Sequence, residues 1–181
     1  MPRLIRSLSR RAAPILLSAS FTAALAAPAL EVEETATVAV PPAAVWKVIG
    51  DYAGLHEWHP AIASTEISQG KDNVRGAVRT LTTKDGARIV EELLAYDGKG
   101  HSMTYRFLES PMPVKDYVST LSVKPEGKGS RIVWKGEFNP VGDIDDANAK
   151  DIFVGIYRAG FDGARARLGA AAKNREAGQA E

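Results

Sequence analysis

The chain has 181 residues, 45% of them hydrophobic and 25% charged, which is enough for one domain with a hydrophobic core. It contains no cysteine, and this excludes disulfide scaffolds, thiolate metal sites and cysteine nucleophiles. Four of the 23 basic residues and none of the 22 acidic residues lie in positions 1–26, so the remainder is mildly acidic and argues against nucleic-acid binding.

The N-terminus predicts a cleavable secretory signal peptide over residues 1–26. Four arginines in the first eleven residues precede an apolar, small-residue run over 12–26, which ends in the A-x-A sequence Ala24-Leu25-Ala26. A cut after Ala29, a twin-arginine route through Ser9-Arg10-Arg11 and a retained anchor are the alternatives. The run is short for a membrane span. We therefore expect a periplasmic protein without an integral membrane span once the signal is removed.

The next segment predicts one strand and two short helices. Val32, Val38 and Val40 alternate with polar residues over 31–40, and Pro41-Pro42 then ends the strand because proline has no N–H to donate. A short helix is expected over 43–49, with Gly50 at its end. A second, broken helical turn is expected to end before Pro60.

Beyond Pro60 the apolar residues alternate with period two, which predicts six strands, at 63–69, 77–83, 87–96, 102–109, 116–124 and 130–138. Short turn sequences that contain glycine lie between consecutive predicted strands at three places, 84–86, 97–100 and 126–129. Strands joined in this way form an antiparallel meander.

The last element is a long helix over 145–173. Apolar residues recur there every three or four positions and form one stripe that needs a surface to cover. We therefore predict an α+β helix-grip fold, in which a curved antiparallel sheet of about seven strands wraps around the C-terminal helix. Residues 27–173 would form this single domain, and residues 174–181 a flexible polar tail.

A family resemblance supports this prediction. Residues 45–52 (VWKVIGDY), followed by Trp58-His59-Pro60, resemble the opening of the START-related, Bet v-like SRPBCC superfamily, in its polyketide cyclase/dehydrase branch. The stretches 78–81, 85–86, 91–94, 105–106 and 111–117 are similar to its periplasmic MxaD-type subgroup. That resemblance implies an accessory protein that supports methanol dehydrogenase and its cytochrome c acceptor. The superfamily also includes cyclases, hydrolases and lipid carriers, and a fold does not fix a reaction.

The most informative polar residues lie on the hairpin around Lys84-Asp85-Gly86. A three-residue loop with Gly86 in the left-handed region sets Arg79 opposite Glu91, whereas a two-residue loop sets Arg79 opposite Glu92. Either register predicts a cross-strand ion pair. An inward pair would orient a polar group of a ligand, and an outward pair would contribute about 0 to 1 kcal/mol.

Several large side chains are candidates for the wall of a cavity, and the alternative is that they only seal the sheet against the helix. The predicted cavity residues are Arg79, Leu81, Glu91, Leu93, Tyr105, Tyr117, Trp134, Phe153 and Tyr157.

The segment His56-Glu57-Trp58-His59 lacks the H-E-x-x-H spacing of a metal site, and we predict no metal there. We expect a turn in which Trp58 packs under the sheet rim and the histidines are partly solvated. In a functional interpretation, His56, Trp58, His59 and Pro60 form a rim that contacts a ligand or a partner. The acidic segment 143–148 does not match a calcium loop, and Asp145 or Asp146 is expected to cap the long helix.

These observations favour a non-enzymatic protein without a cofactor. It would bind a small apolar ligand, a periplasmic redox protein such as a dehydrogenase or cytochrome c, or both. The alternative is a cyclase, dehydratase or hydrolase that uses Arg79, Glu91, Tyr105 or Tyr117 as acid, base or oxyanion partner. A third possibility is a purely structural envelope protein with side chains filling the groove.

Overall fold

The computed structural model describes residues 29–177, so the predicted signal peptide and the last four residues of the predicted tail lie outside the described part. The seven strands are β1 (Leu30–Val38), β2 (Ile62–Gln69), β3 (Val78–Thr83), β4 (Arg88–Asp97), β5 (Ser102–Glu109), β6 (Val114–Glu126) and β7 (Gly129–Pro140). The helices are α1 (Pro42–Ile49), the 3-10 turn η1 (Tyr52–Gly54), α2 (Leu55–Trp58) and α3 (Asp146–Ala177).

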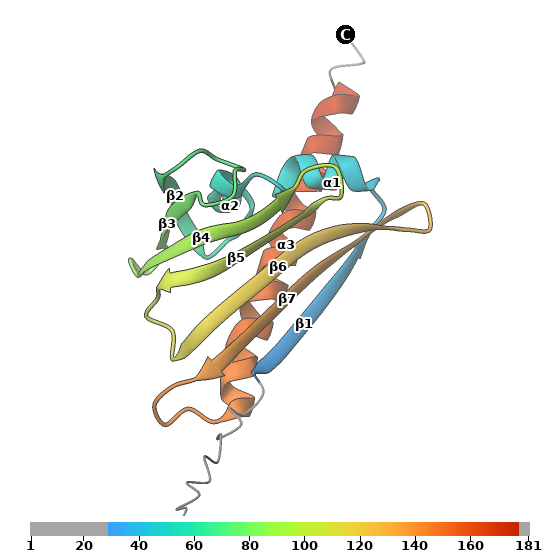
Figure 1. Cartoon of the computed structure of the whole chain (residues 1–181). Helices are drawn as coiled ribbons and strands as arrows, with labels where there is room; N and C mark the ends of the chain where they lie inside the picture. Colours follow the sequence, from blue (N-terminus) through green and yellow to red (C-terminus); the bar gives the residue numbers. More distant parts are fainter. Residues whose placement is uncertain (1–28, 178–181) are drawn as a thin grey trace, which may run out of the picture.

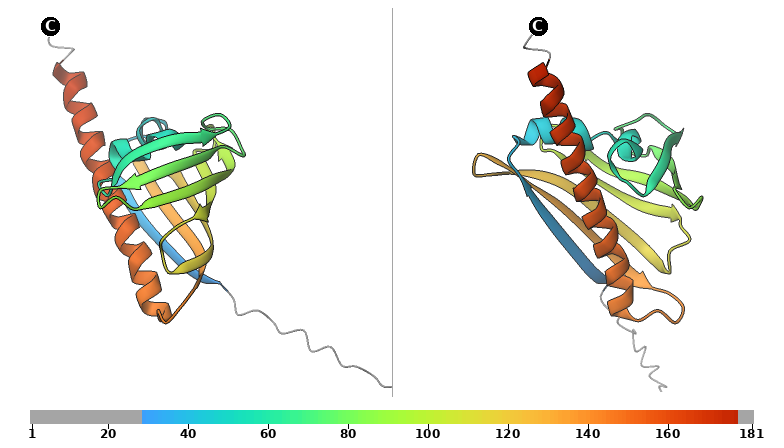
Figure 2. Two further views of the ribbon diagram at one scale, coloured as in Figure 1. Left: turned by 90° about the vertical axis from the view of Figure 1, so that its left-hand side faces the viewer. Right: turned by 180° about the vertical axis from the view of Figure 1, so that it is seen from behind.

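The strands form one antiparallel sheet in the order β1-β7-β6-β5-β4-β3-β2. Strands β2 to β7 are the predicted meander, and β1 joins its far edge by pairing with β7. The sheet curves around α3, and the short helices α1 and α2 lie at one end of it (Figures 1 and 2). This arrangement confirms the predicted helix-grip fold.

Register shifts interrupt the pairing of β2, β4 and β6 with their neighbours. Such bulges bend a strand and increase its twist, which helps the sheet to curve. One bulge, between Lys115 and Val118, contains Asp116 at φ +56°. The side chain of Asn139 donates a hydrogen bond to Asp116 Oδ2 at 3.1 Å and holds this turn of the chain in place.

Helix α3 covers the concave face of the sheet with one buried stripe, formed by Ala149, Phe153, Tyr157, Phe161, Ala164 and Leu168. Asp145 caps the helix by accepting a hydrogen bond from the backbone N–H of Asn148 at 2.8 Å. Of the two predicted candidates, Asp145 and Asp146, the cap is therefore Asp145. The helix ends at Ala177 rather than at the predicted 173, and its C-terminal part projects beyond α1 (Figure 1). No helix among residues 29–177 is long and apolar enough to cross a membrane.

Two glycines let α3 approach its neighbours closely. A Cβ on Gly163 would overlap the carbonyl oxygen of Trp58, and one on Gly160 would lie 2.6 Å from the Trp134 ring. Both distances are far below an ordinary van der Waals contact, so any larger residue would push the helix away. The short helix α2 and the middle of β7 thereby pack directly against α3.

Candidate functional site

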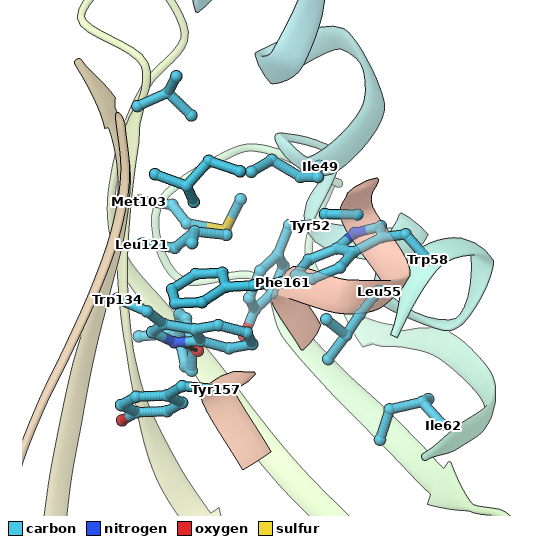
Figure 3. Packing of buried hydrophobic residues seen from close by; sticks show 14 of the residues in the cluster. Ile49, Tyr52, Leu55, Trp58, Ile62, Met103, Leu121, Trp134, Tyr157 and Phe161 are labelled. Atoms are coloured by element: carbon cyan, nitrogen blue, oxygen red, sulfur yellow. Dashed lines mark hydrogen bonds between the residues drawn. The ribbon is translucent and has the colours of Figure 1, made fainter. Parts of the chain in front are cut away.

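A cavity of about 90 Å³ lies between the concave face of the sheet and α3. Fifteen residues form its wall, and they come from α2, the loop after it, strands β2 to β7, the loop between β5 and β6, and α3. They are Leu55, His59, Ala61, Ile62, Leu81, Thr83, Ile89, Glu91, Tyr105, Phe107, Met112, Tyr117, Trp134, Phe153 and Ile156. Most of them are apolar, so the cavity favours an apolar guest. Figure 3 shows the packing beside it, where Leu55 and Trp58 face Trp134 and Phe161.

One buried ion pair lies on the sheet side of the cavity, and its acidic partner, Glu91, lines the wall. The hairpin has the three-residue loop with Gly86 at φ +88°, and β3 and β4 pair with Arg79 opposite Glu91. Arg79 Nε donates to Glu91 Oε2 at 2.6 Å, and both side chains are less than 5% exposed. The pair therefore points inward rather than outward. The partner of Arg79 is Glu91 rather than Glu92.

Further contacts of Arg79 fix its position. Its second guanidinium nitrogen donates to the carbonyl oxygen of Tyr52 at 2.6 Å. The guanidinium also lies 4.1 Å from the ring centre of Tyr52 and 5.0 Å from that of Tyr105. Two aromatic faces, a carbonyl and a carboxylate thus replace the water that the charge has lost. Burial raises the pKa of the Glu91 carboxyl, and the adjacent guanidinium opposes this rise.

A second polar network joins the aromatic hydroxyls of the cavity wall. Trp134 Nε1 donates to Tyr105 Oη at 2.8 Å and to Ser119 Oγ at 3.0 Å, and Ser119 in turn donates to the Lys135 carbonyl at 2.8 Å. The hydroxyls of Tyr117 and Tyr157 are 3.0 Å apart. Burial raises the pKa of Tyr157 to about 12 and shifts those of Tyr105 and Tyr117 upward as well. All three hydroxyls are therefore neutral hydrogen-bonding groups at neutral pH.

His59 is part of the cavity wall and is buried. Its Nδ1 accepts a hydrogen bond from the backbone N–H of Ala61 at 3.2 Å, which assigns the hydrogen to Nε2, and Nε2 donates to the Ile156 carbonyl at 3.1 Å. Burial lowers the pKa of this imidazole, although the hydrogen bond to Ile156 opposes the effect. His59 is therefore a neutral link between α2 and α3.

Six of the nine predicted cavity residues line the cavity, namely Leu81, Glu91, Tyr105, Tyr117, Trp134 and Phe153. The other three do not: Arg79 and Tyr157 lie behind the wall, where they hold Glu91 and Tyr117, and Leu93 packs in the core. Their predicted place in the cavity wall is not found, and contact of any of the nine residues with a ligand stays a prediction. Inward orientation on a strand or helix does not distinguish the lining of a cavity from the layer behind it.

The predicted rim at 56–60 is divided. His56 and Pro60 are exposed, as a rim requires, but Trp58 and His59 are only 5% and 3% exposed. The expected partial solvation of His59 is therefore wrong, whereas the expected packing of Trp58 is found. Contact of these residues with a ligand or partner stays a prediction. Trp58 packs 5.7 Å from the centre of Trp134, and α3 covers His59 through its bond to Ile156.

Tyr52 and Ser119 were not predicted as site residues. Ser119 follows Tyr117 by two positions, so its inward orientation could have been read from the period of the strand. Tyr52 acts through its carbonyl and the face of its ring, and a sequence pattern carries no signal for these contacts.

Comparison with known proteins places this architecture in a family. Residues 29–169 match the family described as polyketide cyclase / dehydrase and lipid transport. The chain belongs to this family. The family supports binding of small apolar ligands, in agreement with the apolar cavity.

Individual relatives agree with this assignment. The chain is 29% identical to MLP-like protein 423 of Arabidopsis thaliana over 125 residues, which cover 62% of this chain and 79% of the relative. It is similar to the structure of the protein XoxI from Bacillus cereus, with a TM-score of 0.70 and 33% identity over 76% of this chain and 95% of that one. Ara h 8.0201, at a TM-score of 0.64 and 21% identity over 78% and 99% of the two chains, shares the fold.

Proposed function

We propose that this protein is an exported, non-enzymatic binding protein for a small apolar molecule, which it holds between the sheet and α3. The observation that carries the proposal is the cavity itself, whose wall is mostly apolar and whose titratable groups each have at least one hydrogen-bond partner. Glu91 is bound to Arg79, both ring nitrogens of His59 are bonded to backbone, and Tyr117 is bonded to Tyr157. A wall of this kind offers shape and low polarity rather than a free general base.

The finer proposal is a periplasmic, MxaD-like accessory role toward a dehydrogenase and its cytochrome c. Its support is the resemblance of 78–81, 85–86, 91–94, 105–106 and 111–117 to that subgroup, together with the 33% identity to XoxI. Export is supported by the sequence of residues 1–26. The exposed part of the rim, His56 and Pro60, is the surface that we assign to such a partner.

Native mass spectrometry of the protein as isolated from its source cells, compared with its denatured mass, tests the binding proposal. We expect an additional non-covalent mass that disappears on denaturation. Leu81→Trp should abolish it because the added volume fills a cavity of only about 90 Å³. The neighbouring Thr80→Trp, at a half-buried position of alternate orientation, should retain it. An empty wild-type protein would contradict the proposal.

Affinity capture from the same cells tests the accessory role separately. A tagged chain should retrieve a dehydrogenase or a c-type cytochrome, and His56→Glu should reduce the yield of that protein. Capture of neither class would refute the accessory role and leave the binding proposal unaffected.

An enzyme of the cyclase or dehydratase type is the second candidate, and one observation favours it. Glu91 lines the cavity and burial raises its pKa, as a general acid requires. Incubation with the molecule identified by mass spectrometry would show conversion if this candidate holds. Unchanged turnover in Glu91→Gln would exclude Glu91 as the acid or base.

A further inference from the structure

We propose that the molecule bound in this cavity is a neutral alcohol or phenol whose hydroxyl group meets Glu91 and Tyr105. This inference rests on the proposed binding function and names the class of ligand that the polar groups of the wall would select.

The charges in and behind the wall require a neutral ligand. Arg79 and Glu91 compensate each other at 2.6 Å, and His59 is held in its neutral form by the N–H of Ala61. A carboxylate or ammonium group on the ligand would add a charge without a counter-charge to an otherwise apolar cavity. Transfer of an unpaired charge from water into such surroundings is strongly unfavourable.

The hydrogen-bonding capacity of the wall then favours a hydroxyl group. Among residues 29–177 the Glu91 carboxylate accepts one hydrogen bond, from Arg79 through Oε2, and Oε1 is left for the cavity that Glu91 lines. An ionised carboxylate only accepts, so the ligand must donate to it. Tyr105 Oη accepts from Trp134 Nε1, so its own O–H is free to rotate toward Ser119 or toward the cavity that Tyr105 lines.

Glu91 and Tyr105 lie on the adjacent strands β4 and β5 and both line the cavity. Arg79 contacts the Glu91 carboxylate and the face of the Tyr105 ring. Their two roles are complementary, since Glu91 takes a hydrogen and Tyr105 supplies one. A hydroxyl group both donates and accepts, and it therefore satisfies both residues at once. A hydrocarbon satisfies neither of them, and an ether or ketone lacks the donor that Glu91 needs.

The size of the cavity limits the rest of the ligand. Its volume of about 90 Å³ is smaller than the roughly 150 Å³ apolar cavity known to hold a benzene ring. Met112 and Ile156 are half-buried wall residues, and the unbranched side chain of methionine adapts easily. A single ring or a short branched chain thus fits after a small displacement of Met112.

Calorimetric titration of the full chain with four probes of one ring size tests the inference: phenol, benzene, benzoate and benzylammonium. We expect phenol to bind about tenfold or more tightly than benzene, because its hydroxyl gains hydrogen bonds to a charged acceptor and to Tyr105. Benzoate and benzylammonium should bind more weakly than phenol. Glu91→Gln should reduce the preference for phenol without weakening benzene.

Two variants guard against a trivial loss of folding. The double variant Arg79→Met with Glu91→Leu removes both charges together and should bind benzene but lose the preference for phenol. Glu92→Gln is the matched control, because Glu92 is the next residue and pairs with the half-exposed Arg106 on the other face of the sheet. It should leave the binding of all four probes unchanged.

The outcomes separate the two proposals. Equal affinity for benzene and phenol would overturn the inference while the cavity remains a binding site. Tighter binding of benzoate or benzylammonium would overturn it too, because the ligand class would then be charged. Failure of all four probes to bind would contradict the proposed function together with the inference.

Discussion

At the scale of single residues, the Arg79–Glu91 pair is the feature on which the interior depends most. It lies among aromatic rings and is less than 5% exposed, whereas the pair formed by Arg106 and Glu92 is at least a quarter exposed. Desolvation of two charges nearly cancels their attraction, so the pair adds little net stability. Removal of one partner leaves an unpaired buried charge.

This predicts strong non-additivity. Arg79→Met or Glu91→Leu alone should lower the free energy of unfolding by about 3–5 kcal/mol, and the double variant should be close to wild type. Urea denaturation of all four chains measures the coupling. The same cycle on Arg106 and Glu92 should give single effects below about 1 kcal/mol. Additive effects at Arg79 and Glu91 would show that the two charges do not form a pair in solution.

His59 makes stability depend on pH. Its folded pKa lies below the ordinary value of about 6.5, so below that pH the unfolded chain binds a proton that the folded chain does not. The contribution of His59 is fully present above pH 6.5 and is lost as the pH falls. The free energy of unfolding of wild type should therefore drop between pH 7 and pH 5.

Asp72 acts in the opposite direction, because burial and the neighbouring Asp51 raise its pKa to about 6. Its raised pKa adds stability as the pH falls toward its ordinary value, so it partly masks the effect of His59. Wild type and His59→Gln both contain Asp72, so the difference between their free energies of unfolding at each pH does not include the contribution of Asp72. Wild type should lose more stability than His59→Gln between pH 7 and pH 5, and parallel curves would refute the role of His59.

At the scale of elements, α3 contains glycines with opposite roles. A Cβ on Gly155 meets nothing within 4 Å, whereas one on Gly163 would overlap the Trp58 carbonyl, which is backbone and has little freedom to move. Glycine in the interior of a helix costs up to about 1 kcal/mol relative to alanine. The close approach at Gly163 outweighs that cost because it allows α3 to pack on α2.

Two alanine substitutions should consequently have opposite signs. Gly155→Ala should raise the free energy of unfolding by up to about 1 kcal/mol, and Gly163→Ala should lower it by more than about 2 kcal/mol. Thermal and urea unfolding of the two variants, which have the same chemical change in the same helix, provide the measurement. A neutral Gly163→Ala would mean that α3 does not pack against Trp58 as described.

At the scale of the whole molecule, stability comes from the apolar layer between sheet and helix rather than from charge. Within residues 29–177, Arg79–Glu91 is the only ion pair with both side chains buried, and the others lie on the surface. Surface pairs are screened by salt and contribute little, whereas a buried pair is hardly screened.

An increase in NaCl from about 0.05 M to about 0.5 M should therefore change the free energy of unfolding by less than about 1 kcal/mol. Urea denaturation of the wild-type protein, which retains the buried Arg79–Glu91 pair, measures the free energy of unfolding at the two salt concentrations. A loss of several kcal/mol would show that the surface ion pairs are a major source of stability.

Local patterns in the sequence by themselves determined the fold. The period-two alternation, the glycine turns and the apolar stripe of the last helix predicted the seven strands and their meander, because these features depend on residues close together in the chain. The family resemblance rests on the same segments. Those patterns also narrowed the partner of Arg79 to Glu91 or Glu92.

Only the tertiary structure decided what those residues do. The choice of Glu91, the inward direction of the pair and the burial of His59 depend on β3, β4 and α3 packing together, and α3 is distant in the chain. The size of the cavity has the same origin, since it is the space that side chains from α2, six strands, two loops and α3 leave unfilled. Periodicity reports which side of an element faces inward, whereas a binding site depends on how closely the opposing elements approach.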